Sequence, residues 1–125
     1  MDVGKFLNGS EIAEWRRIPG TNVEIKMRLV RPIRMREIGQ QAKRLSYDGR
    51  RSTPETDTDE FNRLLLDECV GDWKNIESDG KPLPCNRENK ILLDNNWPAF
   101  SRTWNTGWAE MTADVKQSEE KEVKN

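Results

Sequence analysis

The chain has 125 residues, a net charge of −1, two cysteines and no histidine. This length is typical of one domain, and a hydrophobic content of 34% allows only a thin core. The lack of histidine removes the most common general base and metal ligand, and two cysteines are too few for a disulfide framework. No apolar run is long enough to predict a membrane span or a signal peptide. We therefore expect a non-enzymatic protein of a reducing cytoplasm, without metal, cofactor or catalytic residues.

Charge is distributed unevenly along the sequence. Residues 1–56 contain 12 basic and 7 acidic residues, a net charge of +5, whereas residues 57–125 contain 9 basic and 15 acidic residues, a net charge of −6. Such an asymmetry favours docking on a charged partner, or self-association.

The first thirty residues predict a β-hairpin. Residues 1–10 contain glycine, asparagine and serine and predict a flexible lead-in. Residues 23–29 alternate apolar and polar side chains, which is typical of a half-buried strand. The Pro19-Gly20 pair before them favours a turn, so residues 11–18 are expected to form the partner strand.

A helix and a loop are expected next. Pro32 can occupy the first position of a helix. Apolar side chains then recur at helical spacing at Met35, Ile38, Ala42 and Leu45. Residues 46–58 are charged and rich in turn-forming residues, so they predict a loop.

The second half predicts two helices joined by an irregular segment. Asp57 or Asp59 can cap the first of these helices, which is expected to end at Gly71-Asp72. Residues 73–84 contain two prolines and an Asp-Gly turn and predict irregular structure. Asn86 is a good cap for a short helix that ends near residues 94–96.

The last helix begins at Pro98 and has the cleanest amphipathic pattern in the chain. Its stripe consists of Trp97, Phe100, Trp104, Trp108, Met111 and Val115. Gly107 lies inside this helix at a cost of about 1 kcal/mol relative to alanine. It either permits a close helix contact or marks a flexible joint. Residues 116–125 predict a charged, disordered tail. The predicted fold is α+β and mainly α, with an N-terminal antiparallel hairpin, about four helices and a single domain over residues 11–115.

Two patterns that suggest a ligand have simpler explanations. Asp57, Asp59 and Glu68 have the spacing of a calcium loop, but Asn62 occupies the position that requires glycine. Helix capping explains these acids better. The basic residues of the first half suggest nucleic acid, but no recognition motif frames them and the whole chain is not basic.

We expect instead that the candidate site residues bind protein. Arg34, Arg36, Lys43 and Arg44 form a candidate docking patch for an acidic protein surface. Trp108 and Met111, beyond Gly107, form a second candidate if the joint interpretation of that glycine holds.

The order of several segments resembles that of a known family. These segments are the N-terminal strand pair, a basic helix opened by Arg31-Pro32-Ile33-Arg34, a helix that ends in Cys69-Val70-Gly71-Asp72-Trp73, and the run from Asp79-Gly80-Lys81-Pro82-Leu83-Pro84 to Asn89. The arrangement is similar to that of the small tail assembly chaperones encoded by tailed phages and prophages. The resemblance covers roughly residues 20–110.

The resemblance implies a non-enzymatic chaperone in the host cytoplasm, absent from the mature virion. It would bind the tape-measure protein, keep it soluble and help to recruit tail tube subunits. No site residue is transferred, because the family has no catalytic motif to match. The alternatives are a small nucleic-acid-associated accessory domain that uses the basic first half, or a structural tail component. The partners that we expect are therefore proteins, including a second copy of the chain, with no nucleic acid and no membrane.

Overall fold

The computed structural model describes residues 3–7, 9, 11–48 and 51–123. The helices are α1 (Gly4–Leu7), α2 (Pro32–Gln41), α3 (Thr58–Cys69), α4 (Arg87–Asn96) and α5 (Pro98–Val123). The strands are β1 (Ala13–Arg17), β2 (Glu24–Arg28), β3 (Lys43–Asp48), β4 (Arg51–Thr56), β5 (Val70–Lys74), β6 (Glu77–Ser78) and β7 (Lys81–Pro82). The predicted class, α+β and mainly α, is confirmed. No helix in these ranges is both long and apolar enough to cross a membrane.

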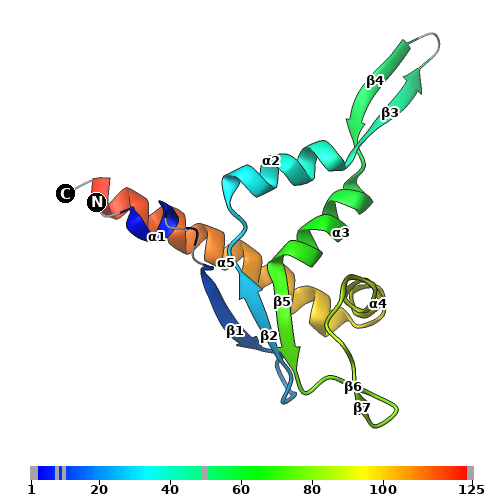
Figure 1. Cartoon of the computed structure of the whole chain (residues 1–125), viewed down its shortest axis with the longest axis vertical. Helices are drawn as coiled ribbons and strands as arrows, with labels where there is room; N and C mark the ends of the chain where they lie inside the picture. Colours follow the sequence, from blue (N-terminus) through cyan, green and yellow to red (C-terminus); the bar gives the residue numbers. More distant parts are fainter. Residues whose placement is uncertain (1–2, 8, 10, 49–50, 124–125) are drawn as a thin grey trace.

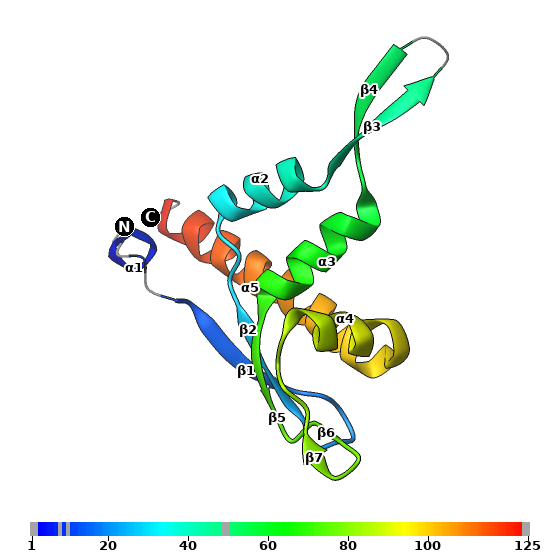
Figure 2. The same ribbon diagram turned by 45° about the vertical axis from the view of Figure 1, so that its right-hand side comes forward.

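A three-stranded antiparallel sheet in the order β1-β2-β5 forms the centre of the fold, and α5 crosses one of its faces (Figures 1 and 2). The predicted N-terminal hairpin is confirmed as β1 and β2. Its turn is closed by the backbone N–H of Ile18, which donates to the carbonyl of Val23 at 2.9 Å. Gly20 has a φ of +79°, a conformation that favours glycine, so it explains why this turn forms here.

The third strand, β5, corrects the prediction that α3 ends in irregular structure. The register places Val70 opposite Met27 and Asp72 opposite Lys26, so Gly71 is an extra residue in β5. This bulge allows Val70 and Trp73 to be buried although they are three residues apart. A spacing of three residues between buried side chains is also typical of a helix. For this reason the apolar pattern did not predict a strand here.

The hairpin of β3 and β4 is a second correction. We predicted a helix through Leu45 and then a loop over residues 46–58, but α2 ends at Gln41 and residues 43–48 pair with residues 51–56 as antiparallel strands. At its base, the N–H of Asp57 donates to the carbonyl of Ala42 at 2.7 Å. Ala42 is buried and ends the apolar stripe of α2. The hairpin projects away from the sheet between α2 and α3 (Figures 1 and 2).

The predicted helix caps and the Asp-Gly turn are confirmed. The carboxylate of Asp57 accepts a hydrogen bond from the N–H of Glu60 at 3.2 Å, and the side chain of Asn86 accepts one from the N–H of Asn89 at 2.8 Å. Asp79 and Gly80 both have positive φ and join β6 to β7. The capping interpretation of Asp57 therefore accounts for the calcium-like spacing.

The aromatic stripe of α5 forms much of the core. Phe100 is 0% exposed and Trp104 is 2% exposed. The indole N–H of Trp104 donates to the Asp94 carboxylate at 2.8 Å, so its polar group is satisfied. Phe100 also meets Trp73 of β5 edge to face, with ring centroids 6.1 Å apart. The core therefore joins α5 to the far edge of the sheet.

Both ends of the described chain differ from the predicted flexible segments. α1 occupies part of residues 1–10, and α5 continues through Val123 into the expected disordered tail. Lysine, glutamine and glutamate dominate residues 116–122 and are good helix formers, which explains how the helix extends past its apolar stripe.

Gly107 marks a close contact of α5 with the sheet. A Cβ atom there would lie 2.9 Å from Cδ of Arg16 and 3.2 Å from Cγ of Met27. Of the two interpretations of this glycine, the structure supports the close contact, because any side chain would displace groups of both β1 and β2.

We predict that truncations of two α5 tryptophans have unequal effects. Trp104→Ala should lower the free energy of unfolding by about 3–5 kcal/mol, because it leaves a cavity and removes the partner of Asp94. Trp108→Ala should cost about 1.5 kcal/mol or less, because Trp108 is only half-buried. Urea unfolding of both variants measures the difference, and equal losses would contradict it.

Candidate protein-binding groove

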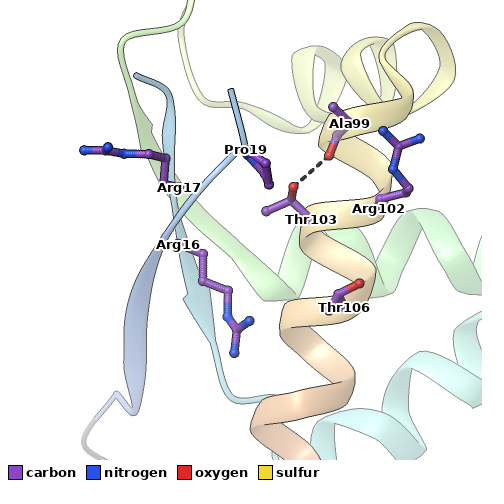
Figure 3. A pocket seen from close by; sticks show the side chains of 7 residues that line it. All are labelled: Arg16, Arg17, Pro19, Ala99, Arg102, Thr103 and Thr106. Atoms are coloured by element: carbon purple, nitrogen blue, oxygen red, sulfur yellow. Dashed lines mark hydrogen bonds between the residues drawn. The ribbon is translucent and has the colours of Figure 1, made fainter. Parts of the chain in front are cut away.

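An open groove lies between the C-terminal end of β1 and the first turns of α5 (Figure 3). Its volume is about 560 Å³. It is lined by Arg16, Arg17, Pro19, Ala99, Arg102, Thr103 and Thr106. We call it the β1–α5 groove. Its lining contains three arginines and no carboxylate. Arg16 is paired with Glu14 and Glu110, so the positive charge of the groove comes from Arg17 and Arg102.

Arg16 is held in place at one end of the groove. Its guanidinium donates to Glu14 and to Glu110 of α5, both at 2.6 Å. Partial burial opposes its charge, but these two hydrogen bonds raise the pKa of Arg16 above its ordinary value. Arg16 therefore ties β1 to α5, and its charge is largely neutralised by protein groups.

Arg17 and Arg102 differ from Arg16 because both are exposed. In the described ranges, no carboxylate forms an ion pair with either of them. Figure 3 shows Arg17 extending from β1 away from α5, and Arg102 extending from the side of α5 that is turned away from β1. These two guanidiniums lie on the two outer sides of the groove, where a negatively charged partner that covers it can reach them.

The floor of the groove is made of small side chains. The hydroxyl of Thr103 donates to the carbonyl of Ala99 at 2.7 Å, as the dashed line in Figure 3 shows. With its hydroxyl so engaged, Thr103 adds a methyl group to the surface of Pro19 and Ala99 that a partner chain can contact. A shallow apolar floor with a charged rim is typical of a protein-binding surface.

The four residues of the candidate docking patch are divided between α2 and β3. Arg34 forms ion pairs with Glu37 and, at 3.1 Å, with Glu68 of α3. Arg36 is exposed on α2, while Lys43 and Arg44 belong to β3 and not to the same helix. The side chain of Arg44 lies outside the described residues. The predicted helix through Leu45 would have placed Arg36, Lys43 and Arg44 on one element, and this part of the prediction is wrong because α2 ends at Gln41.

The second predicted patch is largely core. Met111 is only 7% exposed and belongs to the buried cluster, and Trp108 is half-buried against it. Because α5 lies close to the sheet at Gly107, the side chains of Trp108 and Met111 stay at least partly covered. These two side chains do not form an exposed surface.

The groove could not be predicted from the sequence because its parts are distant in the chain. Arg17 and Arg102 are separated by 85 positions, and neither lies in a recognisable motif. The only local signal is the Arg16-Arg17 pair directly before a predicted turn. The pairing of β1 with β2 beneath α5 is needed to bring the two segments together.

Both cysteines are free thiols that are at least partly buried. Among the described residues, no group of three or more potential ligands could hold a metal ion. Cys69 is fully buried, and burial raises the pKa of its thiol to about 12. Burial also raises the pKa of the Cys85 thiol. Both thiols are free, and both are protonated at neutral pH.

Comparison with known proteins returned no match to a family model, a curated protein or a solved structure.

We predict that Cys69 reacts with iodoacetamide only when the protein unfolds. With a pKa near 12, about 10⁻⁴ of the thiol is ionised at pH 8, and the core excludes the reagent. The rate at each cysteine is measured by peptide mass spectrometry with and without denaturant. Cys85, which is only half-buried, is the internal control and should react faster in the folded protein. Equal native rates for the two thiols would contradict the prediction.

Proposed function

We propose that the protein is a non-enzymatic tail assembly chaperone whose β1–α5 groove binds an acidic segment of the tape-measure protein. The observation that supports the binding site is the exposed Arg102, which forms no ion pair with the described residues, beside a floor of small side chains. The tail-chaperone identity is supported by the order of segments from the strand pair to the Asp-Gly-Lys-Pro-Leu-Pro turn. In this role the protein acts in the host cytoplasm, helps to recruit tail tube subunits and is absent from the mature virion.

The contact chemistry suits reversible binding. An exposed arginine at a rim attracts a carboxylate and speeds association more than it strengthens the final complex. The open floor adds contact area without a deep pocket, so the bound segment can leave when the tail assembles. A chaperone needs this combination, since it must release its client.

The basic first half supports the nucleic-acid alternative less well. Arg28 donates to the backbone carbonyl of Glu68 at 3.1 Å, and Arg34 pairs with the Glu68 side chain. Lys26 pairs with Glu11 at 2.8 Å. These cations are satisfied within the protein, so a phosphate backbone would have to compete with carboxylates and carbonyls that are already in place.

The groove is tested by charge reversal. Arg102→Glu should weaken binding to the tape-measure protein of the same phage about tenfold, because an attractive rim charge becomes repulsive. The measurement is the amount of tape-measure protein that stays soluble and co-purifies after co-expression. Thr106→Glu, which places a carboxylate inside the groove, should act in the same direction.

The matched control is Lys81→Glu in β7. It changes the net charge by the same amount at an exposed position away from the groove. It should leave the co-purified amount unchanged. Equal loss with Lys81→Glu would show a general charge effect and would contradict the groove as the binding site.

We also predict only non-specific DNA binding. At about 150 mM salt the dissociation constant for duplex DNA should be roughly 10⁻⁴ M or weaker. Fluorescence anisotropy with a labelled duplex measures it. Sub-micromolar binding would contradict the chaperone proposal and favour the nucleic-acid alternative.

A further inference from the structure

The edge strand β1 has an open hydrogen-bonding side. Backbone bonds join Leu29 to Ile12 at 2.8 Å and Ile18 to Val23 at 2.9 Å at the two ends of the β1–β2 ladder. Because hydrogen-bonded pairs alternate along an antiparallel ladder, Glu14 and Arg16 also point their backbone groups toward β2. The N–H and carbonyl groups of Ala13, Trp15 and Arg17 therefore point outward. In both views, none of the elements drawn lies along that side of β1 (Figures 1 and 2).

The other edge of the sheet is less suited to pairing. β5 contains the bulge at Gly71, which disturbs a regular ladder. The indole of Trp73 in β5 also donates to the carbonyl of Leu83 at 2.7 Å, so the following segment lies against this strand. β1 has no register shift against β2. It is the more regular of the two edges.

The sequence of β1 is complementary to itself. Consider an antiparallel pair of β1 strands centred on Trp15. The backbone of Ala13 in one copy would hydrogen-bond to that of Arg17 in the other, and the two Trp15 residues would hydrogen-bond to each other. Glu14 of one copy would then lie opposite Arg16 of the other on the same face, at the closest cross-strand spacing. Opposite charges at that spacing stabilise a pair, and like charges destabilise it. Glu14 also accepts from Arg16 of its own chain, so in the paired strands each of these four charges would have only opposite charges as its nearest neighbours.

The neighbouring registers fail this test. A shift by two residues in one direction places Glu14 opposite Glu14, and a shift in the other direction places Arg16 opposite Arg16. A shift by one residue would pair outward groups with groups already bonded to β2. Of these registers, only the one centred on Trp15 satisfies the backbone and pairs opposite charges.

We propose that two copies of the chain associate through β1 in this register and form a continuous six-stranded sheet. The exposed indole of Trp15, which is 39% accessible, would be covered by its counterpart. The two-fold axis is perpendicular to the sheet, so the contact is isologous and closes at two copies. The inference does not depend on the proposed chaperone function.

The register is tested by cross-linking the full chain in a Cys85→Ser background. Trp15→Cys should form a disulfide-linked dimer under mild oxidation, because opposed residues of a hydrogen-bonded pair have Cα atoms about 5.5 Å apart. Arg17→Cys alone should not cross-link. A mixture of Ala13→Cys and Arg17→Cys proteins, which keeps Trp15, should give the heterodimer. Cross-linking of Arg17→Cys as efficient as that of Trp15→Cys would overturn the register.

The association itself is tested by sedimentation over a range of concentrations. Ala13→Pro removes an outward N–H that the β1–β2 ladder does not use, and should abolish the dimer, whereas Ala13→Thr retains it. Glu14→Arg should weaken the dimer about tenfold and Glu14→Gln less, because repulsion replaces attraction at two symmetric positions. Circular dichroism verifies that each variant folds. A chain that stays monomeric at all concentrations, or an Ala13→Pro variant that dimerises normally, would overturn the proposal.

Discussion

The close approach of α5 to the sheet at Gly107 is the constraint on which the rest of the structure depends. With no side chain at this position, the helix lies against Met27 of β2 and the side chain of Arg16 in β1. Arg16 then reaches Glu110, one turn further along α5. The same approach buries Met111. Gly107 therefore determines how closely α5 packs on the sheet, and it also determines where Arg16 lies between the helix and the hairpin.

The charge asymmetry of the sequence is used partly within the molecule. Arg34 from the basic half pairs with Glu68 from the acidic half, and Arg16 pairs with Glu110 across 94 positions. Each of these partly exposed pairs contributes little to stability, on the order of 1 kcal/mol or less. Their effect is on specificity, because they orient α2 on α3 and α5 on β1. Charged side chains that form no ion pair in the described part of the chain, such as Arg102, can then be distinguished from those with a structural role.

Features encoded within a few residues could be predicted from the sequence. The caps at Asp57 and Asn86, the turn at Gly20 and the aromatic stripe of α5 each depend on neighbours within a turn or two. Features that depend on distant partners could not. β5 is a strand because β2 offers it an edge, and the bulge at Gly71 gives it a helix-like spacing. The groove likewise exists only after residues near positions 17 and 102 have been brought together by the sheet.

The groove and the open edge share β1, and this has a consequence for how the proposed activities would combine. Arg16 lies at one end of the groove and also in the register proposed for the dimer. A two-fold axis perpendicular to the sheet leaves both copies of α5, and hence both grooves, on one face of the joined sheet. A long client that occupies one groove would meet the second at a high effective concentration, so weak individual contacts would act together. Two weak, open sites on one face would hold an extended protein and still release it one contact at a time.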